Sequence, residues 1–305
     1  MIYIGIDYHK RYSVATQMDE TGKILSQIRL SNDSDTLLGY LRGLPKGTKI
    51  ALEATGSWYY FYEMAEGMGL DIHLAHPLKT RAIAAARIKT DKIDSTILAH
   101  LLRTNLLPTS YIPARATRDA REILRYRASL VFLRASLSAC IAQAGLKNKV
   151  HAILGKNGLV ARCDEIFSKG GIAWLRSLEV RPCYRQALDG YLNLAEQLNC
   201  LIGAVSRQIE QMVKKDPRAV LLTTIPGISY YSALLIISEI GDINRFPTYG
   251  HLLSYGGLVP SVHSSGGRTR LGRITKEGSK WLRWILVETG YHAARGAERR
   301  DYITE

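Results

Sequence analysis

Cysteine is scarce in this sequence, and the few cysteines present are widely separated. Cys140, Cys163, Cys183 and Cys200 form no C-x-x-C pair, which argues against a zinc site and favours a reduced, cytosolic setting. Long hydrophobic runs are also missing, because the longest, near residues 233–237, is far too short to span a bilayer. The first residues lack the basic segment and apolar stretch of a secretory signal, so we expect neither secretion nor membrane insertion.

Acidic residues are also in short supply relative to basic ones. The chain has 41 Lys and Arg against 27 Asp and Glu, which gives a formal net charge of +14. This balance predicts a polyanionic partner, with nucleic acid as the default. A basic protein with an ordinary solvated surface is the alternative. The length of 305 residues, with 46% hydrophobic content, is enough for two domains or for one domain with large insertions.

The first third of the sequence has a mixed α/β pattern. Residues 2–30 predict three strands, with a hairpin turn at residues 19–22. Helices are then predicted at 34–42 and 58–68, strands at 49–53 and 71–75, and a helical region from Pro77 to about Asn105. Three strands followed by alternating helices and strands predict a mixed α/β sheet with both faces covered.

The whole chain divides into three predicted parts. Residues 1–110 form the α/β domain, with a helical extension that could reach about residue 150. Residues 111–215 form a helical, coiled-coil arm, and residues 216–305 form a compact, mainly helical domain rich in Gly, Ser, Tyr and Arg. The arm predicts a pair of long helices that pack on each other or on a second subunit, so a dimerisation arm and an ordinary helical subdomain both remain open.

Four carboxylates stand out in the α/β part. Asp7 and Glu53 each end an apolar strand, whereas Asp91 and Asp94 lie three residues apart where a helix should begin. Carboxylates at the ends of neighbouring strands converge at one sheet edge, and the i, i+3 spacing puts the other two on one helix face. Each acid alone could be structural, but together they predict a site for one or two Mg²⁺ ions and phosphodiester chemistry.

A second group of candidate residues lies in the C-terminal part, where a Ser-Ser-Gly-Gly segment precedes several cations. Small residues expose backbone N–H groups to phosphate, and arginine binds phosphate bidentately. A serine here could attack phosphorus if it were activated, and His263 is the nearest possible base. From these residues alone, a flexible loop that binds phosphate without chemistry is favoured. The residues concerned are Ser264, Ser265, Arg268, Arg270, Arg273 and Lys276.

Further nucleic-acid contacts are predicted from a turn and from basic residues. Gly227 lies in the segment TIPGI (224–228), which is typical of a helix-hairpin-helix but also of a simple turn between packed helices. Three arginines at i, i+3 and i+7 give the start of the arm one basic face, and two lysines flank Asp91. These basic candidates are Arg118, Arg121, Arg125, Lys89 and Lys92.

The acidic motifs resemble a known family. The segments GIDYHK (5–10), LEATG (52–56) and KTDKIDS (89–95) look like the N-terminal domain of the DEDD transposases of the IS110 insertion-sequence family. The segments GLVP, SSGG, GRITKEG and WLR, between residues 257 and 283, match the C-terminal transposase domain of the same family. The resemblance implies a RuvC-like, ribonuclease-H-type fold with Asp7, Glu53, Asp91 and Asp94 as the metal-binding tetrad.

The same resemblance implies a mechanism. The protein would be an RNA-guided DNA recombinase of a prokaryotic nucleoid that inserts and excises an insertion sequence. Ser265 would form a transient phosphoserine link to DNA, with Ser264 as the alternative because the serine is doubled. The metal-binding tetrad beside this serine would come from another subunit of a dimer or tetramer. A structured noncoding bridge RNA would pair with donor and target DNA. The alternatives are a metal-dependent nuclease or Holliday-junction resolvase that uses the four carboxylates alone, and a nucleic-acid-binding protein without activity.

Overall fold

The chain folds into two compact units, Met1–Ile112 and Pro113–Glu305. A computed structural model describes residues 1–305 apart from 55–57, 85–89, 139–145, 162–165, 266–267 and 302–305. Each unit has its own apolar core. Both of the later predicted parts fall within the second unit, and their separation at residue 215 stays a prediction. Among the described helices, none combines the length and apolarity needed to cross a membrane.

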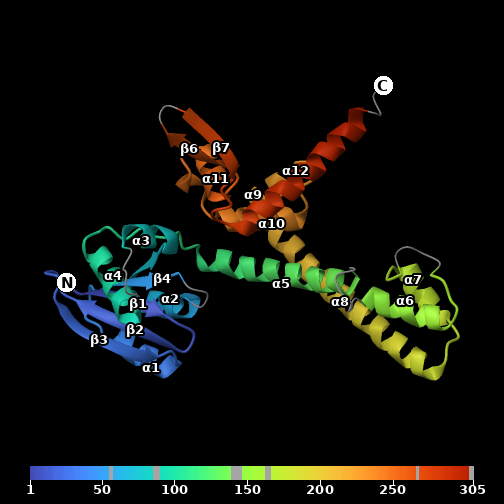
Figure 1. Ribbon diagram of the computed structural model, residues 1–305, viewed down its shortest axis with the longest axis horizontal. Coiled ribbons are helices and arrows are strands. Elements are labelled where there is room, and N and C mark those ends of the chain that lie inside the picture. Colours follow the sequence, from blue (N-terminus) through green and yellow to red (C-terminus); the bar gives the residue numbers. More distant parts are fainter. Residues whose placement is uncertain (55–57, 85–89, 139–145, 162–165, 266–267, 302–305) are drawn as a thin grey trace. The chain divides into compact units, whose positions relative to one another are not determined.

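The first unit is built on a five-stranded sheet of order β3-β2-β1-β4-β5 (Figure 1). Strands β1, β2 and β3 form an antiparallel meander, whereas β4 is parallel to β1 and β5 is parallel to β4. The sheet therefore confirms the predicted mixed α/β architecture. Its strands are β1 (Tyr3–Tyr8), β2 (Tyr12–Met18), β3 (Ile24–Ser31), β4 (Lys49–Glu53) and β5 (Asp71–Ala75).

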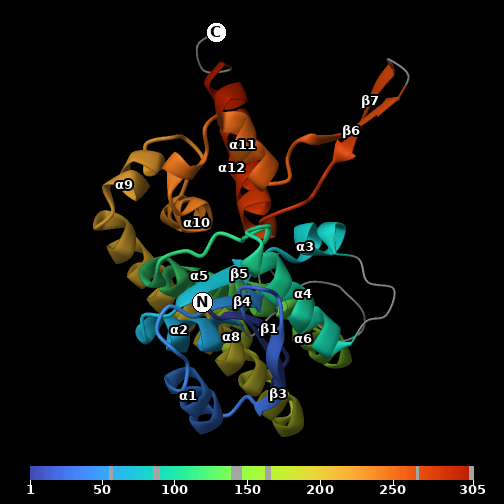
Figure 2. The same ribbon diagram turned by 90° about the vertical axis from the view of Figure 1, so that its left-hand side faces the viewer.

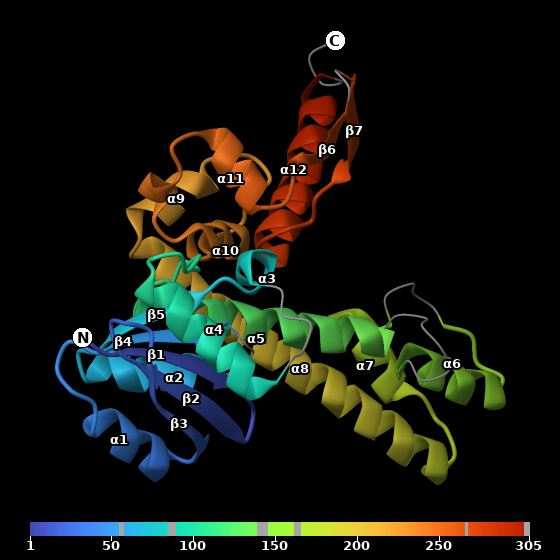
Figure 3. The same ribbon diagram turned by 60° about the vertical axis from the view of Figure 1, so that its left-hand side comes forward.

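Helices cover both faces of this sheet (Figure 3). Ile4 and Ile6 of β1 face the core formed with α1 (Ser34–Arg42) and α2 (Trp58–Gly67). Ala51 of β4 faces the opposite side, where it packs with Leu98 and Leu102 of α4 (Asp91–Arg103). Because successive strand residues alternate between faces, Asp7 and Glu53 belong to the α4 side. Helix α3 (Pro77–Ile83) connects β5 to the segment before α4.

Helix α4 lies very close to β1 because β1 has a glycine at the contact. A Cβ atom on Gly5 would overlap the carbonyl oxygen of Ser95, so only glycine allows this approach. The buried hydroxyls of Thr16 and Ser95 then hydrogen-bond at 2.8 Å, and the Gln27 amide donates to the Lys92 carbonyl at 3.1 Å. These contacts fix the first turn of α4, and with it Asp91 and Asp94, beside the end of β1.

The second unit is organised by two long helices. Helices α5 and α8 run side by side (Figure 3), and α8, with 33 residues, extends for about 50 Å. Their apolar faces join α10 and α12 in one core, while α6 and α7 pack on the first half of α8 in another. The helices of this unit are α5 (Arg115–Ser138), α6 (Leu146–Lys156), α7 (Lys169–Ser177), α8 (Pro182–Lys214), α9 (Pro217–Thr223), α10 (Tyr230–Ile240), η1 (Ile243–Arg245), α11 (Tyr249–Tyr255) and α12 (Lys280–Asp301).

Between α11 and α12 the chain forms a two-stranded hairpin, β6 (Pro260–Ser265) and β7 (Arg268–Ile274), that extends away from the helices (Figure 2). Its base is tightly fixed. A Cβ atom on Gly278 would overlap the Tyr255 carbonyl, and φ at Gly278 is +91°. The Arg283 guanidinium donates to the Gly256 carbonyl at 3.0 Å. The hairpin thus starts from a rigid platform at the ends of α11 and α12.

Candidate functional site

The four predicted acids come from two strand ends and one helix start within the first unit. Asp7 and Glu53 each follow the paired residues Ile6 and Leu52 of parallel strands, so they stand next to each other at one edge of the sheet. Asp91 opens α4, and its N-cap residue Thr90 accepts a hydrogen bond from the Ile93 amide. Asp94 follows within the first turn of the same helix.

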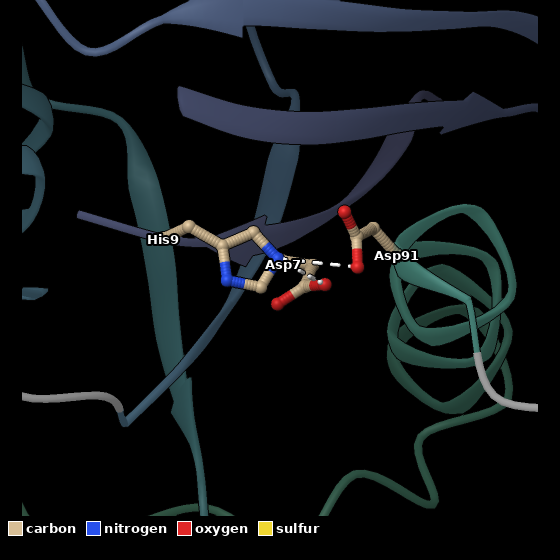
Figure 4. A group of neighbouring side chains, drawn as sticks. All are labelled: Asp7, His9 and Asp91. Carbon is tan, nitrogen blue, oxygen red and sulfur yellow. Dashed lines mark ion pairs between the residues drawn. The ribbon is translucent and has the colours of Figure 1, made fainter. Parts of the chain in front are cut away.

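A histidine joins this group. His9 Nε2 lies 3.1 Å from Asp7 Oδ2 and 3.3 Å from Asp91 Oδ1, so this ring nitrogen faces both carboxylates (Figure 4). Nε2 is buried and has no hydrogen bond of adequate geometry. The ring packs against Tyr12 with 4.9 Å between centroids, and the Tyr12 hydroxyl donates to Asp91 Oδ2 at 2.9 Å.

Burial and neighbouring charges give Asp7 and Asp91 opposite electrostatic character. The pKa of Asp7 is raised from 3.8 to about 6, first because the carboxyl is buried and then because Glu53, Asp91 and Asp94 repel its charge; His9 opposes this rise. The pKa of Asp91 is lowered, chiefly by the hydrogen bond from Tyr12. The site thus concentrates negative charge around one buried carboxyl, an arrangement that a cation would stabilise.

The residues present fit a divalent metal. Ligand atoms of Asp7, His9 and Asp91 all lie within 4.8 Å of one another. A metal would also satisfy the buried Nε2 of His9, which otherwise has no hydrogen-bond partner. His9 was not among the residues predicted from sequence. Its signal was its place two residues after Asp7, a spacing that puts side chains on the same side of an extended chain.

The serine segment lies in the β6–β7 hairpin of the second unit. The register pairs Ser265 with Arg268 and His263 with Arg270, whereas Ser264 pairs with Thr269 and Val262 with Leu271. Partners across an antiparallel ribbon share a face, and faces alternate along each strand. By position, Ser265 therefore belongs to the face with His263, Arg268 and Arg270. Ser264 belongs to the other face, with the exposed apolar pair Val262 and Leu271.

The other predicted cations near the two motifs are mostly on the surface. Lys92 is exposed in the first turn of α4. Arg270, Arg273 and Lys276 are exposed along and after β7, and Lys276 has φ +57°. Lys89, like Gly266 and Gly267, lies outside the described residues. The exposure of these cations leaves them accessible, and their contact with nucleic acid stays a prediction.

The predicted basic face at the start of the arm needs correction. Arg118 and Arg121 are only 4% and 8% exposed. Arg118 donates to the Pro113 carbonyl, and Arg121 donates to the carbonyls of Ser238 and Glu239. The i, i+3, i+7 spacing did identify one helix face, but that face packs on α10 in the described structure. Arg125, half-buried, pairs with Glu239 at 3.4 Å.

The Pro-Gly turn also packs closely against a helix. Gly227 adopts φ +89° in the connection between α9 and α10. A Cβ atom here would lie 3.0 Å from the amide nitrogen of Ala293 and 3.1 Å from the carbonyl oxygen of Thr289, both in α12. Glycine is therefore required for close helix contact, which favours the simple turn between packed helices over a phosphate-binding hairpin.

Comparison with known proteins accounts for both groups of residues. Residues 4–150 match a DEDD domain of IS110 elements described as "Transposase", and residues 219–303 match the "Transposase IS116/IS110/IS902 family". A "Probable family 20 transposase" of Pseudomonas aeruginosa is 28% identical over 97% of this chain and 84% of its own length. The "Transposase for insertion sequence element IS1111A" of Coxiella burnetii is 24% identical over 97% of this chain and 78% of its own length. The "Transposase for insertion sequence element IS1328" of Yersinia enterocolitica is 25% identical over 93% of this chain and 81% of its own length. The acidic motifs thus fall within the first match and the serine hairpin within the second, and the chain belongs to the IS116/IS110/IS902 family of DNA transposases.

Proposed function

We propose that this transposase is an RNA-guided recombinase that joins DNA strands through a serine nucleophile and a Mg²⁺-binding acidic site. The observation that carries the metal part is the buried carboxyl of Asp7, which is surrounded by Glu53, Asp91 and Asp94 and faces an unsatisfied His9 nitrogen. The sheet order β3-β2-β1-β4-β5 supports a RuvC-like assignment for this unit.

The acids have distinct proposed roles. Asp7 and Asp91 would be the central ligands because their oxygens already converge, and Glu53 and Asp94 would complete the tetrad. Tyr12 orients Asp91 by holding its second oxygen. Bound Mg²⁺ would stabilise the negative charge that develops on the phosphate and on the leaving oxygen. Carboxylate oxygens are the ligands this ion prefers.

The serine step is a transesterification. The Ser265 oxygen forms a bond to phosphorus, the bond from phosphorus to a deoxyribose oxygen breaks, and the serine proton ends on that oxygen as an alcohol. A second DNA alcohol then attacks the phosphoserine and returns the proton to the serine, so no water or oxidant is consumed. Ser265 is favoured over Ser264 because its ribbon position is shared with His263, Arg268 and Arg270.

The partners follow from the family resemblance and the charge. Donor and target DNA are the substrates of a transposase, and a structured bridge RNA would select them by base pairing. The acids and the serine belong to different units. We propose a homo-oligomer, a dimer or tetramer, in which the serine of one copy acts with the acids of another.

The serine is tested by trapping the covalent intermediate. Wild-type protein incubated with its element DNA should yield a protein–DNA adduct that survives denaturation, and Ser265→Ala should yield none. Ser264→Ala is the matched control, since it changes the neighbouring residue on the other ribbon face. Adduct formation by Ser265→Ala, with loss in Ser264→Ala, would move the nucleophile to Ser264. Full recombination by both variants would exclude a serine mechanism.

The alternative hypothesis, a metal-dependent nuclease that uses the four carboxylates alone, makes different predictions. It expects DNA cleavage that depends on Asp7 yet persists in both serine variants. RNA guidance is tested separately, by asking whether a defined RNA copurifies with the protein and whether its removal stops recombination. Recombination of RNA-free protein at the full rate would contradict guidance and leave the serine result untouched.

A further inference from the structure

A pocket of about 400 Å³ has Asp91 in its wall, whereas Asp7 does not line it. Arg29 and Lys92 line it together with Tyr12, Thr90 and Asp91. Tyr12 and Arg29 also line a second hollow, together with Arg11. This surface therefore has three cations, Arg11, Arg29 and Lys92, against the single acid Asp91.

Arg29 is held in place by an aromatic ring. Its guanidinium carbon lies 3.8 Å from the Tyr12 ring centroid, a cation–π contact. Arg29 is exposed on the edge strand β3, and within the described residues it forms no ion pair with a carboxylate. A guanidinium fixed by stacking keeps its N–H donors for an outside acceptor, and its fork geometry matches phosphate.

The Tyr12 side chain connects this cation to the acidic site. Arg29 stacks on its ring, and its hydroxyl donates to Asp91 Oδ2 at 2.9 Å. The other oxygen of Asp91, Oδ1, lies 3.3 Å from His9 Nε2. Asp91 thus stands between the proposed metal position and the basic pocket. A DNA strand whose reacting phosphate lies at the metal has a neighbouring phosphate on each side. In one direction along the strand, we expect this neighbouring phosphate to lie near Tyr12.

We infer that Arg29, stacked on Tyr12 and supported by Lys92, forms a subsite for a DNA backbone phosphate that flanks the reacting one. The inference rests on the proposed function, since it takes Asp91 as part of the reaction site. The ligand is phosphate rather than a base, because Arg29 already covers a face of the only ring in the pocket wall among the described residues. The subsite positions the strand and reads no sequence.

The test is salt-dependent DNA binding by the full chain. A fluorescein-labelled single-stranded oligodeoxynucleotide is titrated in EDTA, where neither metal nor the serine reaction contributes, and the logarithm of affinity is followed against the logarithm of salt concentration. Loss of one phosphate contact lowers the slope by about 0.7 for single strands. Arg29→Gln should show this loss and about 5-fold weaker binding at low salt, and Arg29→Lys should restore the slope because it keeps the charge.

Arg42→Gln is the matched control. Arg42 is an exposed arginine of the same unit, but it lies on α1, which packs on the opposite face of the sheet from α4. Its slope should equal that of wild type. Equal slopes for Arg29→Gln and Arg42→Gln would overturn the subsite. A loss confined to an oligoribonucleotide of the same sequence would assign the cations to RNA and overturn the DNA assignment. Because binding is measured without metal, either outcome is independent of whether the serine and metal proposals hold.

Discussion

Two buried carboxylates, one in each unit, have the same exposure and opposite surroundings. Asp7 and Glu239 are both 3% exposed. Around Asp7 are three further acids and one histidine. Around Glu239 are the guanidinium groups of Arg121 and Arg125 and the hydroxyl of Ser279. Depth of burial alone therefore says nothing about which carboxylate serves a reaction.

Glu239 joins three helices of the second unit. Its Oε1 lies 3.7 Å from Arg121 Nε and 3.4 Å from Arg125 Nη2, both on α5. Its Oε2 accepts from Ser279 at 2.8 Å, and Ser279 also accepts from the Leu282 amide at the start of α12. The carboxylate of α10 is thus neutralised and hydrogen-bonded by its own fold. We interpret it as structural.

Asp7 has only His9 to oppose the repulsion from three acids, and the difference from Glu239 gives a criterion. A buried charge that the protein itself neutralises is typical of structure, whereas a buried acid placed among acids requires a cation from outside. Mutation should therefore separate the two residues: removal of Asp7 should affect activity and removal of Glu239 should affect folding.

The largest effect is expected for Asp7→Asn. This change removes a charged ligand but keeps the side-chain shape, so strand transfer should fall about 1,000-fold, the equivalent of several kcal/mol of transition-state stabilisation. Stability should not suffer: at pH 7 the free energy of unfolding in EDTA should rise by roughly 2–3 kcal/mol, because the folded state no longer contains a repelled buried charge. Recombination assays and urea denaturation measure the two effects. Clear destabilisation with retained activity would make Asp7 structural and remove the contrast.

Glu239→Ala should show the reverse pattern. Breaking a buried ion pair leaves Arg121 without its charge partner, and we expect a loss of about 3 kcal/mol in the free energy of unfolding. Glu122→Ala is the matched control: Glu122 also pairs with Arg125, at 3.2 Å, but its side chain is 72% exposed. Its removal should change stability by less than about 0.5 kcal/mol. Similar losses in the two variants, measured by urea denaturation, would show that burial does not decide the value of these pairs.

The sequence predicted the sheet and the convergence of the acids well because both follow local rules. The helix Ser34–Arg42 and the strands Lys49–Glu53 and Asp71–Ala75 have the predicted bounds, set by alternating or periodic apolar residues and by turn residues. The approach of α4 to β1 was not predictable, since Gly5 in a strand does not reveal what packs against it. His9 was missed because its role depends on that approach, which brings Asp91 within 3.3 Å.

The prediction of a basic face on the arm was wrong for a different reason. Helical spacing shows which residues share a face, but it does not show whether that face meets solvent or another helix. Arg118 and Arg121 are long and charged, and the default expectation is exposure. Arg118 instead donates to the nearby Pro113 carbonyl. Arg121 has its partners in the carbonyls at the end of α10 and in the carboxylate of Glu239, more than one hundred positions away in sequence. Only the tertiary structure contains that information.

The smallest expected effect is the pH dependence of stability, and it separates two acids of the same site. The pKa of Asp7 is raised from 3.8 to about 6, so between about pH 4 and 6 the folded protein binds more protons than the unfolded chain. Its contribution to stability is full below pH 4 and is lost as pH rises through 6, by roughly 2–3 kcal/mol. The free energies of unfolding of wild type and Asp7→Asn are measured in EDTA at each pH, and their difference isolates the contribution of Asp7.

Asp91 should give the opposite slope. Its pKa is lowered by the Tyr12 hydroxyl, so its contribution is present above its ordinary pKa and is lost as pH falls. Mg²⁺ should abolish the fall in stability due to Asp7, because the metal requires the ionised carboxyl and replaces the proton. A difference curve for Asp7 that stays flat from pH 4 to 7, with or without Mg²⁺, would mean that neither burial nor the neighbouring acids raise its pKa. Asp7 and Glu239 would then differ only in their position, and the acidic cluster would no longer be a candidate cation site.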